Sequence, residues 1–532
     1  MKRIKGQLLL VLHAHLPYVH HPDFETFMEE RWLFEAITET YLPLIKLFKT
    51  LEKDKIPFKL TISFSPPLME MLNSQDLREK YHKHLLRLIE LAEKEVERTK
   101  NENIKKNEVA KHYRNEFIED REIYVEQYGQ DILKAFKEFQ DKGYIEVITS
   151  NATHAYLPFY RNFPKAINAQ IRLGTLTYKK YFNKDLKGMW LAECAYFEGL
   201  DKYLADEGIN YFFVDSHAFW YAQTPPRYGV YRPIITPNGV YVFARDPESS
   251  EQVWSATVGY PGDSRYREFY RDIGFDREED YIKPYIDKSG IRCNTGIKYY
   301  RITDKTFPLD KKDFYDLKEA EKAVKEHSRD FIFKKVFQIE ELSKIFDDLE
   351  PIIVAPFDAE LFGHWWYEGP RFLENIFRQA AKNETVSFST PSEVIENIEK
   401  VQIVTPSESS WGANGYHEVW LNGSNDWIYK HIHEITEIMI EKAKVYRNPS
   451  ELEKRILNQM AREVLLAQSS DWPFIMSTGT TVEYANKRIK DCVIRFLELD
   501  KMLQEKKTDE KKLSYYEWVD DIFKDIDYSI FS

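Results

Sequence analysis

The sequence predicts an α/β protein built on a barrel of parallel strands, and two observations lead to this fold class. Short apolar segments, of the length that a buried strand needs, alternate with amphipathic, helix-like stretches. Most of these segments end in a polar residue, and in a parallel barrel such residues meet at one mouth. An open doubly wound sheet fits the alternation as well, but no glycine-rich phosphate loop follows the first strand.

Seven segments are expected to form the strands. In chain order they are QLLLVL (7–12), KLTISFS (59–65), IEVIT (145–149), GMWLA (188–192), YFFV (211–214), VYVFA (240–244) and IIVAPF (352–357). The segment VSFS at 386–389 is a candidate for an additional strand. Residues 31–53 and 199–208 are examples of the intervening helices, because their apolar residues recur at helical spacing.

Two other parts of the chain have few strand signals. Residues 73–141 are highly charged, with apolar residues at helical spacing, which predicts an inserted helical subdomain. Residues 407–532 hold three long amphipathic segments and are expected to form a helical C-terminal domain. The barrel would then comprise residues 1–72 and 142–406.

The composition disfavours several classes of protein. A net charge of −12, from 75 basic and 87 acidic residues, argues against nucleic acid or a membrane surface as partner. No apolar stretch approaches the roughly 18 residues of a membrane span. Three dispersed cysteines cannot make a disulfide framework and indicate a reducing compartment, so we expect a cytoplasmic protein. No pattern indicates an oligomeric state.

Aromatic residues make up 15% of the chain. Sugar rings stack their C–H faces on aromatic planes, so this content suits a carbohydrate partner. A large core accounts for most of these rings equally well.

Two strand ends carry a carboxylate in apolar surroundings: Glu193 in WLAECAY and Asp358 in VAPFDAELFGHWW. Glycoside hydrolysis needs one ionised and one protonated carboxyl, about 5 to 5.5 Å apart in a retaining enzyme. The aromatic neighbours of Asp358 would raise its pKa, and Arg245 would help keep Glu193 ionised. Glu360 shares a face with Asp358 and competes for the acid role. Helix capping or pairing with a buried arginine would explain a single such carboxylate as well.

The motif HAHLP places His13 and His15 on one side of an extended segment, as in a zinc pair. With His154, Asp215 and His217 at other strand ends, a metal-dependent polysaccharide deacetylase is an alternative function. No HExxH or similar compact motif is present, however, and neutral imidazoles also bind sugar hydroxyls. These observations disfavour a metal at the histidines.

Five motifs in order carry a resemblance that extends along nearly the whole chain. HAHLP, GYIEVITSNATHAYLP, WLAECAY, APFDAELFGHWW and WLNGSNDW resemble the sequence regions of glycoside hydrolase family 57, in particular its α-glucan branching enzyme and related amylase subgroup. The resemblance implies an incomplete TIM-like (β/α)7 barrel and an α-1,4-glucan partner such as amylose, starch or glycogen. It implies a retaining mechanism without metal or organic cofactor, with Glu193 as nucleophile and Asp358 as acid/base.

The resemblance also implies a set of substrate-binding residues. They are Arg245 in FARD, Gly262 in YPGD, Trp411 in SSWG and Asp471 in SSDW, with His13, His15 and His154 next to the cleaved bond. For Trp411, and likewise for Trp420 and Trp427, packing between the barrel and the C-terminal helices is an equally good interpretation. Trp472 is expected in the core.

Branching and hydrolysis share their first half-reaction and differ in whether a glucan 6-hydroxyl or water attacks the glucosyl-enzyme. Branching members carry a mobile loop with a tyrosine over the cleft. The comparable segment, 220–233, offers Tyr221, Tyr228 and Tyr231 but is compact and stiffened by prolines. We expect a branching enzyme, with an α-amylase as the alternative.

Overall fold

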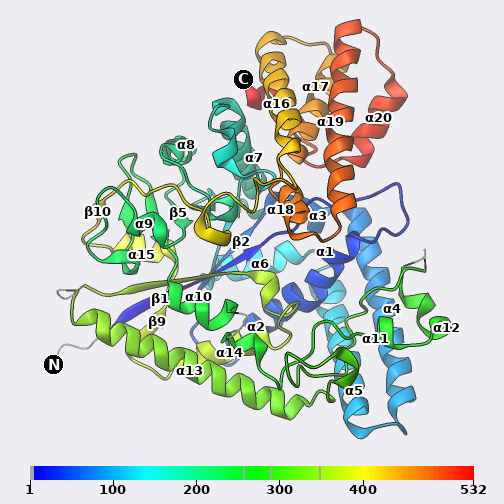
Figure 1. The fold of residues 1–532 in the computed structure, drawn as a ribbon, viewed down its shortest axis with the longest axis vertical. Helices are drawn as coiled ribbons and strands as arrows, with labels where there is room; N and C mark the ends of the chain where they lie inside the picture. Colours follow the sequence, from blue (N-terminus) through cyan, green and yellow to red (C-terminus); the bar gives the residue numbers. More distant parts are fainter. Residues whose placement is uncertain (1–4, 256–257, 288–289, 347–348) are drawn as a thin grey trace.

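The computed structural model describes residues 5–255, 258–287, 290–346 and 349–532. At its centre is a curled sheet of parallel strands (Figure 1), in the order β8, β1, β2, β3, β4, β5, β7. These strands are β1 (Gly6–Ala14), β2 (Leu60–Phe64), β3 (Ile145–Ser150), β4 (Gly188–Trp190), β5 (Tyr211–Val214), β7 (Tyr241–Ala244) and β8 (Ile352–Asp358). All seven predicted strands are therefore confirmed.

Three short strands extend this sheet. β9 (Val386–Phe388) pairs in parallel with the first residues of β1, as expected for VSFS. β6 (Ile234–Ile235) is antiparallel to β7, and β10 (Gln402–Ile403) is parallel to β6. The sequence analysis did not identify these last two, since two-residue strands leave no periodic signal.

The two ends of the parallel sheet meet. The backbone N–H of Asp246, just after β7, donates to the carbonyl oxygen of Val354 in β8 at 2.8 Å. The register pairs His13 at the end of β1 directly with Asp358 at the end of β8. Because paired residues of parallel strands direct their side chains to the same face, these two polar side chains share the mouth of the sheet.

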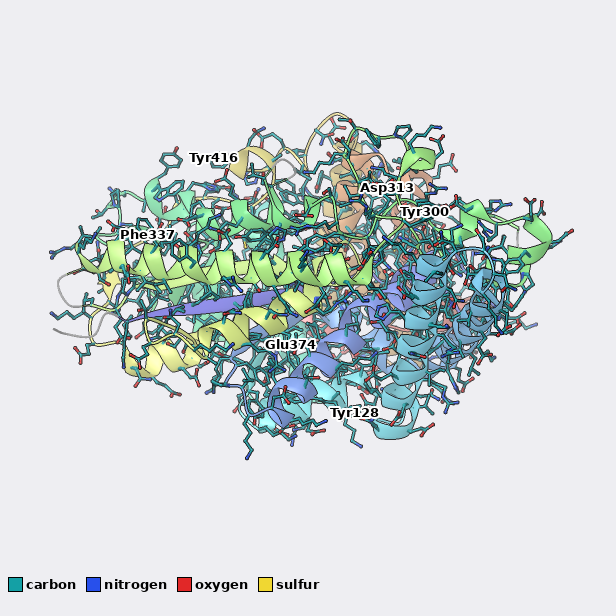
Figure 2. All side chains as sticks on the ribbon, turned by 90° about the horizontal axis from the view of Figure 1, so that it is seen from below. Tyr128, Tyr300, Asp313, Phe337, Glu374 and Tyr416 are labelled. Carbon is teal, nitrogen blue, oxygen red and sulfur yellow. The ribbon has the colours of Figure 1, made fainter. Side chains whose placement is uncertain are left out.

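Helices connect the strands and pack around the sheet (Figure 1). They are α1 (Glu30–Ala36), α2 (Leu42–Lys53), α3 (Pro66–Asn73), α6 (Ile132–Asp141), α7 (Pro164–Phe182), α8 (Leu200–Asp206), α9 (His217–Trp220), α10 (Pro247–Trp254), α13 (Leu317–Ser343), α14 (Gly369–Ala380) and α15 (Pro391–Asn397). The longest, α13, packs on α14 and runs along the side of the molecule (Figure 2), with Phe337 on its solvent-exposed face.

The segment between β2 and β3 contains two long antiparallel helices, α4 (Gln75–Thr99) and α5 (Ile104–Arg121). The sequence analysis missed a second excursion, between β7 and β8. It carries the short helices α11 (Ile273–Asp276) and α12 (Glu279–Ile282) and packs on α4, where the hydroxyls of Tyr281 and Tyr299 both donate to Glu95. The domain boundaries given above stay predictions.

The C-terminal part is helical, as expected, and its helices cluster at one end of the molecule (Figure 1). They are α16 (Trp427–Val445), α17 (Glu451–Ala467), α18 (Asp471–Thr478), α19 (Val482–Glu505) and α20 (Glu510–Val519). The first residue of α18, Asp471, accepts a hydrogen bond from His15, so this part of the chain reaches the barrel mouth.

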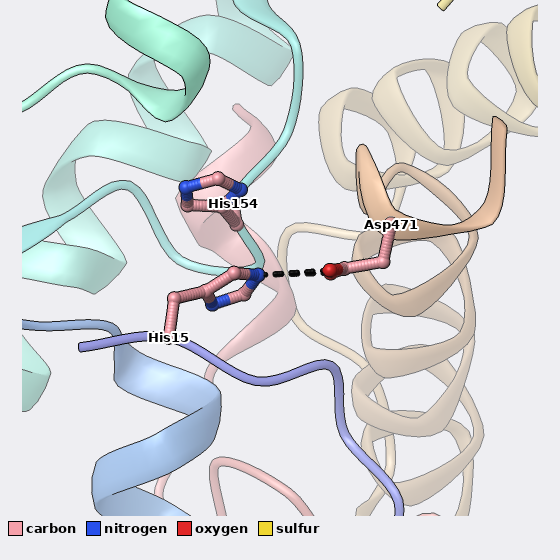
Figure 3. Close-up of side chains that lie close together, drawn as sticks. All are labelled: His15, His154 and Asp471. Atoms are coloured by element: carbon pink, nitrogen blue, oxygen red, sulfur yellow. Dashed lines mark hydrogen bonds and ion pairs between the residues drawn. The ribbon is translucent and has the colours of Figure 1, made fainter. Parts of the chain in front are cut away.

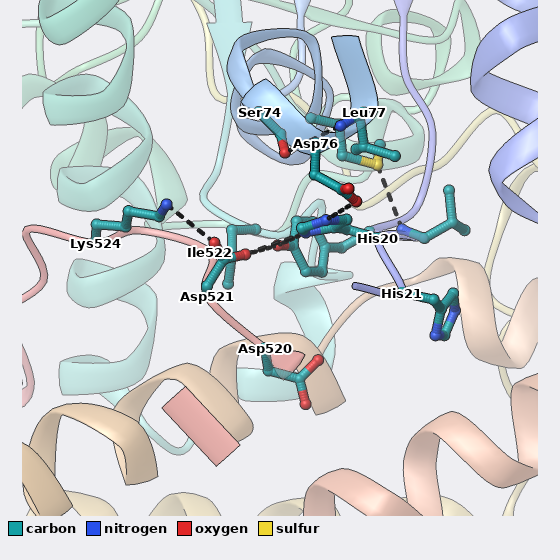
Figure 4. Close-up of polar contacts among 12 residues, drawn as sticks. His20, His21, Ser74, Asp76, Leu77, Asp520, Asp521, Ile522 and Lys524 are labelled. Carbon is teal, nitrogen blue, oxygen red and sulfur yellow. Dashed lines mark hydrogen bonds and ion pairs between the residues drawn. The ribbon is translucent and has the colours of Figure 1, made fainter. Parts of the chain in front are cut away.

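Figure 4 shows a second connection, in which the buried His20 bonds two carboxylates from distant parts of the chain. Its Nε2 lies 3.0 Å from Asp76 of α4, and its Nδ1 lies 3.2 Å from Asp521, beyond α20. His20 thereby ties the helical insertion to the C-terminal segment. Within the described ranges, none of the helices combines the length and the apolar character of a membrane-spanning segment.

Candidate active site

Glu193 follows β4 in a strained turn. Its φ is 61° and that of Cys194 is 51°, and His154, which follows β3, has a φ of 56°. The left-handed region is unfavourable for residues with a Cβ, and such strain gathers at functional sites. The end of β4 is therefore shaped to present one carboxylate, whose side chain is 16% exposed.

Three groups contact the Glu193 carboxylate. The indole N–H of Trp411 donates to Oε2 at 2.8 Å, the Ser470 hydroxyl lies 3.4 Å from Oε1, and Nδ1 of His154 lies 3.8 Å from Oε1. Burial raises the pKa of Glu193 to about 7, while the Trp411 hydrogen bond favours the ionised form. Glu193 can therefore be ionised near neutral pH, as a nucleophile requires.

Asp358 is the last residue of β8, at the same mouth. Burial first, and then the charges of Glu360 and Glu193, raise the pKa of Asp358 well above its ordinary value. Its surroundings therefore favour the protonated form, as the acid of the pair requires. This is the division of roles between acid and nucleophile that retaining glycoside hydrolysis needs.

The competing carboxyl, Glu360, is engaged elsewhere. It accepts hydrogen bonds from the Tyr41 hydroxyl at 2.5 Å and from the backbone N–H of His15 at 3.3 Å, and it is 7% exposed. Burial raises its pKa to about 6. These bonds fix Glu360 against the barrel wall and favour Asp358 for the acid role.

The three predicted histidines form a stack at the mouth. The ring of His154 lies 3.8 Å from that of His15 and 5.0 Å from that of His13, whose other face stacks on Trp190 at 4.7 Å. Figure 3 shows the His15 ring directed at Asp471, and its Nε2 lies 3.0 Å from the Asp471 carboxylate. Burial lowers the pKa of His13 and of His154. Burial acts in the same direction on His15, but Asp471, Glu193 and Glu360 together raise its pKa. Of the three rings, His15 is therefore the one whose surroundings favour the cation.

His15, His154 and Asp471 are also close enough to form a metal-binding group. Nitrogen lone pairs lie in the ring plane, however, and these two rings are stacked at 17° to each other, so their lone pairs do not converge on one ion. The deacetylase interpretation also needed Asp215 and His217. Nδ1 of His217 lies 3.7 Å from the Asp215 carboxylate. Within the part of the chain that the structure describes, neither residue belongs to the group formed by His15, His154 and Asp471.

Arg245 lies beside other carboxyls of the mouth. We predicted that it keeps Glu193 ionised; the groups that most favour the Glu193 anion are Trp411, His15 and Ser470. The Arg245 guanidinium instead lies 3.4 Å from Asp215, and its charge lowers the pKa of Asp358. The end of β7, which carries Arg245, lies next to β5 and contacts β8. An effect of Arg245 on the Glu193 anion stays a prediction.

The other predicted residues divide between the mouth and the periphery. Trp411 belongs to the mouth through its bond to Glu193, while Trp420 and Trp472 are buried in the core. Trp420 stacks on Tyr156 at 4.5 Å, which supports packing as its role. Gly262 lies in a short helical turn where an added Cβ would contact Lys305, and its part in substrate binding stays a prediction.

Sequence reasoning missed Ser470, which connects His154 to Glu193. Its hydroxyl lies 2.9 Å from Nδ1 of His154, and its backbone N–H donates to the carbonyl oxygen of the same residue. The only signal was its place directly before Asp471. A serine in a polar loop is too common to be recognised without the fold.

Known proteins match this chain over most of its length. The sequence model of glycosyl hydrolase family 57 matches residues 9–350, and that of the C-terminal part of 1,4-alpha-glucan branching enzymes matches residues 431–531. A 1,4-alpha-glucan branching enzyme of Thermococcus kodakarensis is 36% identical over 514 residues, which cover 91% of this chain and 72% of the relative.

Two solved structures share the fold across the whole chain. An alpha-amylase of Thermotoga maritima is 55% identical with a TM-score of 0.94, and 99% of each chain is covered. A branching enzyme of this family from Pyrococcus horikoshii is 34% identical with a TM-score of 0.89, covering 99% of this chain and 97% of the other.

Proposed function

Because the chain belongs to glycosyl hydrolase family 57, we propose that it is a 1,4-α-glucan branching enzyme, which cleaves an α-1,4 linkage and rejoins the released chain through an α-1,6 linkage. The observation that carries the chemistry is the pair of buried carboxyls at one mouth, Glu193 and Asp358. The Trp411 hydrogen bond favours the Glu193 anion, while burial and neighbouring carboxylates favour protonated Asp358. We infer that the curled sheet is the incomplete (β/α)7 barrel of this family.

In the first step the Glu193 carboxylate attacks the anomeric carbon while Asp358 gives its proton to the leaving glycosidic oxygen. The bond to the leaving sugar breaks as the ester to Glu193 forms. Trp411 and Ser470 orient the attacking oxygens. Loss of the Glu193 charge in the ester relieves repulsion on Asp358, so the acid becomes a better proton donor as the carboxylate is consumed.

In the second step Asp358, now ionised, removes the proton of the acceptor hydroxyl, which attacks the anomeric carbon and expels Glu193. Two inversions retain the α configuration. His15, whose surroundings favour its cation, and His13 and His154, which burial keeps neutral, supply hydrogen-bond donors and acceptors for the sugar bound next to the cleaved bond.

A second candidate is hydrolysis with little transfer, as in an α-amylase. It is favoured by the 55% identity to a structure described as an alpha-amylase, against 34% for the branching enzyme. The tyrosines of the loop at 220–233 also bear on the choice between branching and hydrolysis, because branching members carry a loop tyrosine over the cleft. Tyr221 is 68% exposed, whereas Tyr228 packs on Phe346. Tyr221 is the tyrosine of this loop that is free to cover an acceptor chain.

Incubation with amylose separates the two candidates. Branching creates α-1,6 signals in the proton NMR spectrum with few new reducing ends, whereas hydrolysis creates reducing ends alone. Glu193→Gln is the inactive control for both. Reducing ends without α-1,6 signals would overturn the branching assignment and leave the retaining mechanism in place. The cytoplasmic location stays a prediction.

A further inference from the structure

A buried carboxylate that the mechanism does not use lies directly beside Arg245. Asp246 is fully buried, at 0% exposure, at the point where β7 ends. An ionised carboxylate in such a place needs a partner, since burying an unpaired charge is very costly. The partner comes from the long helix α13.

Lys335 of α13 is also 0% exposed, and its Nζ lies 3.2 Å from Oδ2 of Asp246. The side-chain amide of Gln338, one helical turn further, donates to Oδ1 at 3.0 Å. Ser249 completes the set by donating its backbone N–H at 2.8 Å and its hydroxyl at 2.5 Å. Both carboxylate oxygens are thus held, and the Asp246 side chain cannot rotate without breaking several bonds.

The same cluster reaches three other elements of the site. The backbone N–H of Asp246 donates to Val354 of β8, four residues before Asp358. Ser249 belongs to the first turn of α10, for which Asp246 is the N-cap. The amide of Gln338 also lies 3.3 Å from the hydroxyl of Tyr231, in the loop at 220–233. The lysine and the glutamine of α13 therefore tie β7, β8, α10 and this loop together.

We propose that Lys335 is a positioning residue for the reaction: by fixing Asp246 it holds the adjacent Arg245 guanidinium between Asp215 and the acid Asp358. The role rests on the proposed function, because Asp358 must be the acid. Arg245 lies 3.4 Å from Asp215 and 6.0 Å from the ring of Trp411, so a small displacement of its backbone changes the charge that Asp358 faces.

The charges around both carboxyls set the expected pH effect. The titratable groups next to Asp246 are Lys335 and Tyr231. Lys335 also lies 3.6 Å from Glu248. Asp358 is faced by Glu360, Glu193 and Arg245, and of these only Arg245 lowers its pKa. If Arg245 moves away, the pKa of Asp358 rises, and the loss of activity caused by deprotonation of the acid shifts to higher pH.

The test compares Lys335→Met with Lys334→Met in the full chain. Lys334 is the neighbouring residue of the same helix and is 45% exposed. It pairs with Asp330 on the surface, and its Nζ lies 5.9 Å from the ring of Tyr260. We expect Lys335→Met to lower kcat/KM on amylose by about tenfold or more and to shift the alkaline limb of the pH profile upward by about one unit. Lys334→Met should match the wild type in both.

Gln338→Leu is the second variant, in case Lys335→Met does not fold, because it removes a neutral partner and leaves the ion pair intact. It should shift the alkaline limb in the same direction by a smaller amount. If both variants fold, lose thermal stability and keep the wild-type pH profile, the residues are merely structural and the positioning role is overturned. Asp358→Asn is measured alongside: if it keeps full activity, the proposed acid is wrong and the positioning role falls with it.

Discussion

Trp411 binds Glu193 twice: its indole N–H donates to Oε2 at 2.8 Å, and its backbone N–H donates to the carbonyl oxygen of Glu193 at 2.9 Å. One bond orients the reactive side chain and the other holds the left-handed backbone that presents it. The two residues are 218 positions apart. The loop around Trp411 therefore completes a site that the barrel strands alone leave open.

Trp411→Phe removes the indole hydrogen bond and keeps an aromatic ring. A hydrogen bond to a charged group contributes about 1.5 to 3 kcal/mol, so kcat/KM should fall about 10- to 100-fold near pH 7. The pKa of Glu193 should rise, because the bond favours its anion, and activity should recover partly at higher pH. Trp427→Phe, at a ring that is 37% exposed, is the matched control. A uniform loss at every pH would argue against this role.

The pH dependence of kcat/KM follows from the two carboxyls. Burial raises the pKa of Glu193 to about 7, and Glu193 must be ionised to attack, so activity should rise with pH through about 7. Asp358 must keep its proton, and burial with the charges of Glu360 and Glu193 raises its pKa, so activity should fall again only well above the ordinary carboxyl range. A bell-shaped profile with an acidic limb near the ordinary carboxyl pKa of about 4 would contradict this electrostatic account.

Removal of metal ions should leave activity unchanged. The stacked rings of His15 and His154 do not direct their lone pairs to one point, and the Asp471 carboxylate is paired with His15. We expect elemental analysis of the purified enzyme to find no stoichiometric zinc, and dialysis against a chelator to preserve the rate. Loss of activity on chelation that zinc restores would revive the deacetylase interpretation.

The His20 bridge should stabilise the protein in a pH-dependent manner. Burial opposes its protonation, but Asp521 and Asp76 together raise the pKa of His20 above 6.5. The stabilisation by His20 is therefore fully present below the pKa that His20 has in the unfolded chain. It is lost as the pH rises through the pKa that His20 has in the folded protein. His20→Gln should lower the free energy of unfolding by about 1 to 3 kcal/mol at pH 6.

Denaturant titrations at pH 6 and pH 9 check this dependence. The difference between wild type and His20→Gln should shrink at the higher pH, while His82→Gln, a change on α4 away from the bridge, should have little effect at either. An unchanged difference across this range would mean that His20 contributes through packing and not through its charge.

Much of the fold could be predicted from the sequence because each barrel strand is buried on both faces and reads as an apolar run. The polar residues that end these runs, such as His13 and Asp358, meet at the mouth because parallel strands bring their carboxyl ends together. The roles of Arg245 and Ser470 could not be predicted in this way. They depend on which strands become neighbours when the sheet curls and on where the C-terminal helices contact the mouth.

The excursion between β7 and β8 escaped prediction for a related reason. It contains short helices and irregular segments without a sustained period, and its contacts with α4 run through tyrosine hydroxyls such as that of Tyr281. Pattern analysis detects regular burial, whereas the buried residues of this part of the chain, such as Ile273 and Ile282, do not recur at a helix or strand period.

The central claim is that Glu193 becomes covalently attached to the sugar. It is tested most directly by mass spectrometry of the Asp358→Asn variant after exposure to an activated α-glucosyl fluoride, which needs no acid to lose its leaving group. The account predicts a glucosyl adduct on the peptide that contains Glu193, and none in the Glu193→Gln, Asp358→Asn double variant. An adduct on the peptide that contains Glu360, or a product of inverted configuration, would contradict it.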